Sequence, residues 1–144
     1  MKETICTVIG MVGAFFTSLL GGWDTSLMVL CIFMRVDYVT GLICAGVFHA
    51  SPKSKSGALE SKASFKGLVR KGVTLLIVLV AHQLDLVLGI NYVRDAVCIA
   101  FIVSEAISIT ENAGLMGVPV PPKIVKAIEL LQQKNENKGG GKDE

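Results

Sequence analysis

Charged side chains interrupt stretches of sequence that are otherwise apolar, and these are the residues that could do chemistry. Arg35 and Asp37 fall inside one such stretch, His82 and Asp85 inside a second, and Glu105 inside a third. An isolated charge at the middle of a bilayer costs roughly 2.5 kcal/mol or more on insertion scales. A membrane bundle must therefore pair these charges with one another or place them against water.

Helical spacing groups the polar side chains into faces. Glu105, Ser108 and Asn112 recur at i, i+3 and i+7 and would form one stripe, and His82 and Asp85 share a face at i, i+3. With a rise of about 1.5 Å per residue, Arg35 lies roughly 12 Å below the outer end of its segment, and His82 on the next, antiparallel segment reaches a similar depth.

Two interpretations of these charges stay open. In the first, Arg35 pairs with Glu105 or Asp37, and the stripe is structural glue between helices. In the second, the stripe meets water once copies assemble, so that the charges line or trigger a pore. The candidate pore-lining or intramembrane polar residues are Arg35, Asp37, Thr40, His82, Asp85, Glu105, Ser108 and Asn112.

Motifs for catalysis, metals or cofactors are missing from the sequence. There is no P-loop, no G-x-S-x-G and no H-E-x-x-H, and neither His49 nor His82 has a nucleophile near it in sequence. The four cysteines stand singly in apolar segments, without a C-x-x-C pair. We expect no enzyme activity, no metal and no cofactor.

The segments that carry the charges are apolar enough to cross a membrane. Of the 144 residues, 51% are hydrophobic and 18% charged, with a mean hydropathy of +0.59, whereas a soluble domain carries about 25% charged residues. We expect an all-α membrane bundle of three to four transmembrane helices. The expected spans are about 5–20, 27–48, 68–90 and 92–112. A net charge of +2 and few aromatic residues argue against nucleic acid as a partner.

The first segment and the C-terminal region differ from the central spans in length and composition. The segment 5–20 is short, since a span needs about 20 residues, so it either crosses the membrane or lies at the interface, with Trp23 as an interfacial anchor. Residues 1–121 would form the membrane domain. After the Pro-rich break, 122–134 predicts a short amphipathic helix on the membrane surface or on a partner, and the rest of 122–144 a flexible charged tail.

Lysine and arginine distribution indicates the orientation. The loop between the second and third spans and the C-terminal tail hold most of the basic residues, while the connections around Trp23 and Asn91 hold only Arg94. The positive-inside rule then places both termini in the cytoplasm if four segments span. With three spans and an interfacial first helix, the N-terminus would lie outside.

Small residues offer faces for close helix packing. Gly10 and Gly13 lie in the first segment, and Gly41, Ala45 and Gly46 in the second. Small side chains let helix backbones approach each other, which suits self-association.

Several short runs occur in order along residues 20–131. They are Gly21-Gly22-Trp23-Asp24, 33–41 (FMRVDYVTG), Ser61-Lys62, Phe65-Lys66-Gly67 with Lys71, 81–85 (AHQLD), Glu105 with 108–114 (SITENAG), and 117–121 (GVPVP). Together these runs resemble the phage-lysis and toxin-secretion holin family, which includes the clostridial toxin-secretion holins. The first segment and the glycine-lysine tail match less closely.

This resemblance implies a holin of the bacterial cytoplasmic membrane. Such a protein accumulates, forms homo-oligomers in membrane lipid and opens lesions that release an endolysin or a large toxin. An antiholin, which inhibits such a protein, would share the fold. A small structural or transport subunit is the alternative from another class, in which the charges serve packing or substrate passage.

Overall fold

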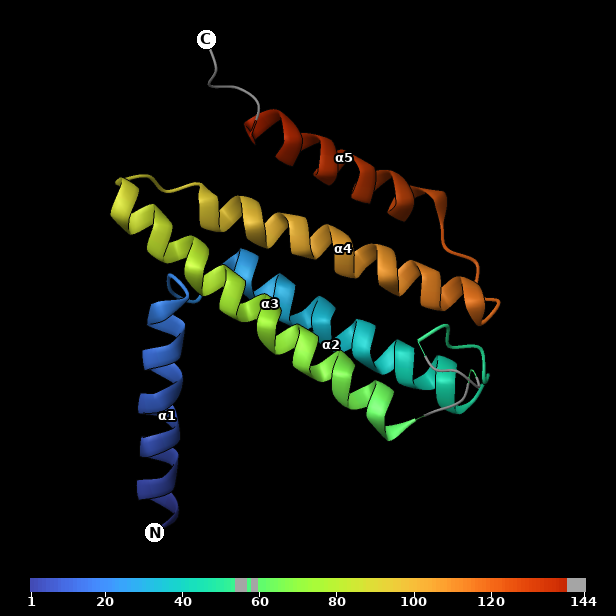
Figure 1. Cartoon of the computed structure of the whole chain (residues 1–144), viewed down its shortest axis with the longest axis horizontal. Helices are drawn as coiled ribbons and strands as arrows, with labels where there is room; N and C mark the ends of the chain where they lie inside the picture. Colours follow the sequence, from blue (N-terminus) through green and yellow to red (C-terminus); the bar gives the residue numbers. More distant parts are fainter. Residues whose placement is uncertain (54–56, 58–59, 140–144) are drawn as a thin grey trace.

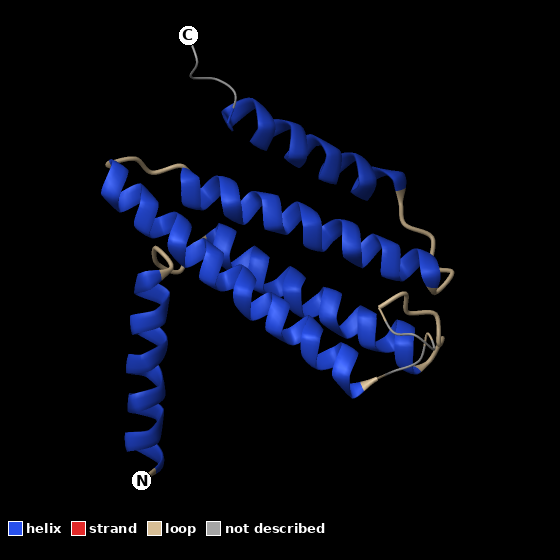
Figure 2. Cartoon of the chain, in the orientation of Figure 1, coloured by secondary structure: helices blue, strands red, loops and turns tan. Residues whose placement is uncertain are grey.

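A computed structural model describes residues 1–53, 57 and 60–139, and every regular element in that part of the chain is an α-helix (Figures 1 and 2). The helices are α1 (Lys2–Leu19), α2 (Thr25–Gly46), α3 (Ser61–Leu88), α4 (Val93–Leu115) and α5 (Pro122–Gly139). Three of them, α1, α2 and α3, are long and apolar enough to cross a membrane. The predicted all-α fold is confirmed.

Helices α2, α3 and α4 form the bundle, and α4 is its centre. The α2–α4 pair is the most extensive, α3 packs mainly on α4, and α2 and α3 touch each other little. The core cluster consists of Leu30 and Met34 of α2, Val78 of α3, and Cys98 and Ile102 of α4. The bundle is therefore held by α4, and the opposite edges of α2 and α3 diverge.

Much of the outer surface is apolar and uncovered by protein. Helix α1 points away from the bundle in Figure 1, and none of its residues is buried. Ile9 and Phe15 of α1, Val39 of α2 and Leu76 of α3 are among its many exposed large hydrophobic side chains. In water such a surface would be a liability, whereas in a bilayer acyl chains cover it.

Aspartate side chains cap the N-termini of two helices, α2 and α4. Asp24 precedes α2 and accepts a hydrogen bond from the N–H of Leu27 at 3.0 Å. Asp85, buried near the end of α3, accepts from the N–H groups of Val93 and Arg94, both at 3.0 Å, and so satisfies the free donors at the start of α4. The predicted intramembrane Asp85 is thus a cap at the turn between two helices.

Arg94 joins the two turns at one end of the bundle. Its Nε donates to the carbonyl of Leu20 at 2.8 Å and its Nη2 to that of Gly22 at 3.1 Å, while Nη1 contacts the carboxylates of Asp24 and Asp95. The guanidinium is buried, and two acids offset its charge. The α1–α2 turn is therefore fixed to the start of α4.

Two helices differ in extent from the sequence expectation. Helix α3 begins at Ser61 rather than near residue 68, so that Lys62 and Lys66 lie on the helix together with Arg70 and Lys71. Helix α5 extends to Gly139 and packs against α4. The tail expected to be flexible lies, from residue 140 onward, outside the described residues.

We predict that Gly21→Ala destabilises the fold more than Gly22→Ala. Both glycines have positive φ, +94° and +90°, so either substitution carries a backbone cost of about 1–2 kcal/mol. A Cβ at position 21 would in addition lie 2.9 Å from Nδ1 of His82 and 3.0 Å from Nε of the pinned Arg94, whereas one at position 22 has open space. Thermal unfolding in detergent should rank Gly22→Ala above Gly21→Ala, and equal losses would contradict the close packing.

Candidate functional site

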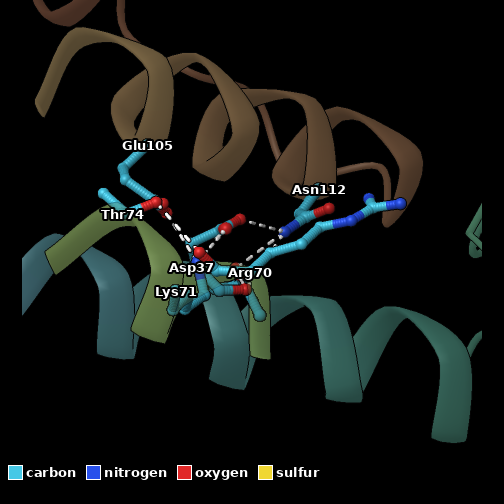
Figure 3. Close-up of polar contacts among 7 residues, drawn as sticks. Asp37, Arg70, Lys71, Thr74, Glu105 and Asn112 are labelled. Atoms are coloured by element: carbon cyan, nitrogen blue, oxygen red, sulfur yellow. Dashed lines mark hydrogen bonds and ion pairs between the residues drawn. The ribbon is translucent and has the colours of Figure 1, made fainter. Parts of the chain in front are cut away.

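An ion cluster lies inside the bundle where α2, α3 and α4 meet (Figure 3). Nζ of Lys71, from α3, donates to Oδ2 of Asp37, from α2, at 2.8 Å, and to Oε2 of Glu105, from α4, at 2.7 Å. The exposed fractions of the three side chains are only 15%, 5% and 13%. One lysine therefore bridges two largely buried carboxylates and ties all three helices together.

Asn112 completes the cluster from the next turns of α4. Its Nδ2 lies within hydrogen-bond distance of three oxygens of α2: Oδ1 of Asp37 at 3.1 Å, Oγ1 of Thr40 at 3.0 Å and the carbonyl of Asp37 at 3.4 Å. Gly41 lies beside this side chain, and a Cβ there would be in ordinary contact with Nδ2 at 3.7 Å. Each buried polar atom of the cluster thus has a partner, as a low-dielectric site requires.

A cleft leads to the cluster between the diverging edges of α2 and α3. Its volume is about 260 Å³, and its lining includes Asp37, Lys71, Glu105, Ser104 and Ser108. The walls toward the α2–α3 loop carry the basic side chains of Lys53, Lys66 and Arg70. Water can therefore reach a cluster that holds two acids for one lysine, and a proton or a further cation could balance the excess negative charge.

The structure unites five of the eight predicted polar residues and leaves three, Arg35, His82 and Asp85, away from the cluster. Asp37, Thr40, Glu105 and Asn112 belong to the cluster, and Ser108 lines its cleft. Arg35 is exposed on α2 and makes no ion pair within the described part of the chain. The expected pairing of Arg35 with Asp37 or Glu105 is wrong, because Lys71 takes that place.

Lys71 is the residue that sequence reasoning missed. Lys71 falls at the start of the expected 68–90 span, beside the basic residues of the preceding loop, and the sequence pattern groups it with them rather than with the intramembrane charges. A signal was present: Gly67, Lys71, Thr74 and Val78 recur at i, i+4, i+7 and i+11, which is one helical face. That face begins with small and polar residues and continues into the core at Val78.

The remaining candidates lie away from the cluster. His82 is half-buried against Gly21, and Trp23 is 59% exposed in the α1–α2 turn, where an interfacial anchor could sit. Gly10 and Gly13 have no neighbour within 4 Å, so their packing faces are open, while Ala45 is buried and Gly46 exposed at the end of α2. In the described residues, no group of His, Cys, Asp and Glu side chains is arranged to hold a metal, and all four cysteines are free thiols.

We predict that Lys71→Met destabilises the bundle by about 3–5 kcal/mol, because it leaves two buried carboxylates without their cation. Arg70→Met is the matched control: the neighbouring side chain is exposed, so its loss should change stability by no more than about 0.5 kcal/mol. Unfolding by denaturant in micelles measures both.

The triple variant Asp37→Asn, Lys71→Met, Glu105→Gln separates charge from packing. Neutralising all three groups should recover most of the stability lost in Lys71→Met. Equal stability of Lys71→Met and the parent protein would contradict the bridging role.

We also predict that the contribution of Asp24 to stability is lost in acid. Partial burial disfavours its charged form, but the hydrogen bonds from Arg94 and from the N–H of Leu27 outweigh this, and the pKa of Asp24 lies below its usual value. A lowered folded-state pKa stabilises the fold above the unfolded value of about 3.9 and loses that effect as the pH falls through the folded value. The stability gap between the parent and Asp24→Asn should close below about pH 3.9, and a constant gap would contradict the Arg94–Asp24 interaction.

Comparisons with known proteins identify a family and several relatives. The chain matches the bacteriophage holin family over residues 14–133. It is 36% identical to an uncharacterised protein of Clostridium perfringens, over 93% of this chain and 96% of that protein. It is 39% identical to an uncharacterised protein of Listeria monocytogenes, over 85% and 83% of the two chains.

One relative carries a functional name. The chain is 30% identical to a probable holin of Bacillus phage phi105, over 76% of each protein. No solved structure matches the chain. The family match extends over most of the helical bundle and α5, and the family is a non-enzymatic family of membrane proteins. The chain belongs to the bacteriophage holin family.

Proposed function

We propose that the chain is a holin that assembles with copies of itself in the bacterial cytoplasmic membrane and opens lesions through which an endolysin or a toxin passes. The observation that carries the proposal is the buried Asp37–Lys71–Glu105 cluster at the end of a cleft, inside a bundle with many exposed apolar side chains. A lesion wall needs this combination of one lipid-facing and one wettable side.

The pairing of charges in the cluster suits a protein that first accumulates without leaking. Each carboxylate lies within hydrogen-bond distance of Lys71, so a single bundle can remain in lipid with most of the cluster's charge compensated and one negative charge left for a proton or a cation in the cleft. Separation of α2 from α3, which touch little, would expose the cluster to water without breaking the extensive α2–α4 pair. Asp37, Glu105 and Ser108 would then line the lesion.

Arg35 supports assembly because, unlike the charges of the cluster, it has no ion-pair partner among the described residues of its own protomer. It lies ten residues, or about 15 Å, from the start of α2, and so near the middle of a helix that could span the membrane. Exposed there among Ile32, Val36 and Val39, its charge would face hydrocarbon in a lone protomer. Water in a lesion, or a neighbouring copy, would remove that cost.

The orientation we propose follows from the basic residues. Lys62, Lys66 and Arg70 lie on the first turns of α3, next to the α2–α3 loop, and would face the cytoplasm together with both termini. Spans over α2, α3 and α4 are part of the proposal. A cytoplasmic N-terminus requires that α1 also spans, which its length and composition allow. An α1 that lies at the interface, pointing away from the bundle as in Figure 1, would instead leave the N-terminus outside.

An antiholin of the same family is the second candidate function. It is favoured by the pairing of Lys71 with Asp37 and Glu105 inside one protomer, because an inhibitor must insert without opening a lesion. The two functions differ in one observable, which is whether the chain alone depolarises a membrane.

Inducible expression in a bacterium, with and without an endolysin, tests the proposal. We predict a delay, then an abrupt loss of membrane potential, and lysis only when the endolysin is present. Arg35→Leu should insert normally but delay the loss of potential several-fold, because the charge that favours assembly is removed. Arg35→Lys should keep the parent timing. Stable insertion of the parent with an unchanged potential would reject the holin and favour the antiholin.

A further inference from the structure

Helix α5 turns back along α4 and packs on it (Figure 1). The apolar residues of α2 and α4 that line the hollow beneath α5 form one face, the α2–α4 face. Leu131 packs against the core cluster. Nδ2 of Asn135 donates to the carbonyl of Ala96 at 3.2 Å, and Ala96 lies in the first turns of α4. Since α5 begins just after the end of α4, it runs along most of the length of that helix.

The contact between α5 and the bundle is loose. Over residues 122–138 no side chain is fully buried, and only Ile128, Leu131 and Asn135 are half-buried. A hollow of about 400 Å³ remains between α5 and the face lined by Phe33, Val36, Val103, Ala106 and Ile109. Within the described residues, Oδ1 of Asn135 is buried without a hydrogen-bond partner. A helix held in this way can leave without disturbing the core.

When α5 is packed along α4, which we call the seated state, its exposed charges conflict with insertion of the bundle in a membrane. Lys126, Glu129 and Lys134 are exposed on α5 beside α4. If the bundle spans the membrane, as the proposed function requires, these charges would lie at the depth of the hydrocarbon. Coverage by α5 and insertion of the bundle therefore exclude each other.

The composition of α5 indicates which surface it binds after it leaves α4. It contains four lysines and two glutamates, and Ile124, Ile128 and Leu131 share the opposite, apolar face. A helix with a basic polar side and an apolar side binds at the interface of a bilayer with anionic headgroups. We propose that α5 is an exchangeable cover: it rests on the α2–α4 face before insertion and moves to the anionic surface of the membrane when the bundle spans it.

This inference rests on the proposed function and adds a step to it. While α5 is seated, the face around Phe33, Val103 and Ala106 is covered. Departure of α5 frees that face and removes the charges from the bundle, so it must precede the opening of a lesion. A chain whose α5 cannot leave should accumulate without opening one.

A disulfide between positions 96 and 135 reports the seated state. The variant carries Ala96→Cys and Asn135→Cys, with Cys6 and Cys31 replaced by serine because these native thiols are not fully buried. The rate of disulfide formation is measured in neutral micelles, in phosphatidylcholine vesicles and in vesicles rich in phosphatidylglycerol. We expect the rate in phosphatidylglycerol to be at least fivefold below that in micelles. Equal rates in micelles and in phosphatidylglycerol would overturn the exchange.

Charge variants of α5 test whether the anionic membrane surface is what binds this helix. Lys126→Gln with Lys134→Gln should restore much of the disulfide rate in phosphatidylglycerol, whereas Lys62→Gln on α3 should not. An equally low rate in phosphatidylcholine, or no effect of the α5 variants, would overturn the anionic surface as the partner.

Dye release from the same vesicles tests the consequence. The oxidised double-cysteine variant should release dye at least tenfold more slowly than its reduced form, and a reductant should restore release. The single Ala96→Cys variant is the control and should not respond. Release by the oxidised form at the reduced rate would overturn the cover. A parent chain that releases no dye would reject the proposed function, while the disulfide rates would still decide the exchange of α5.

Discussion

A buried charge in an apolar bundle must be compensated within reach of its side chain, and the arrangement of α2, α3 and α4 depends on this constraint. Lys71 meets it by bridging Asp37 and Glu105, which come from the other two helices. The pairing stabilises the relative positions of helices that hydrophobic contact alone would leave free to slide in lipid. Asn112 then sets the register of α4 against α2 through the Asp37 and Thr40 oxygens.

The same constraint operates at the other end of the bundle, with different chemistry. There Arg94 is buried, and it is compensated by Asp24 and Asp95 together with backbone carbonyls of the α1–α2 turn. Asp85 caps α4 beside it. One end is thus a rigid joint between turns. The other holds an ion cluster that links all three helices and opens to a cleft.

Sequence patterns predicted the helices well because long apolar runs have few alternatives in a chain of this composition. The stripe of Glu105, Ser108 and Asn112 was also predictable, since the helical period alone places these residues on one face. The basic residue that pairs with Asp37 and Glu105 was not predictable in this way. Choosing between Arg35 and Lys71 requires the rotation of α2 and α3 about their axes, which depends on packing around Leu30 and Val78. The roles of Asp85 and Arg94 likewise depend on a tertiary contact between two turns.

The central claim is that this family member opens lesions by assembling copies of itself. Current recording across a planar bilayer after addition of the purified chain tests it most directly. The account predicts a silent period followed by abrupt conductance steps, whose onset shortens steeply with protein concentration, and passage of folded protein-sized probes. Inserted protein with no steps at any concentration would contradict it.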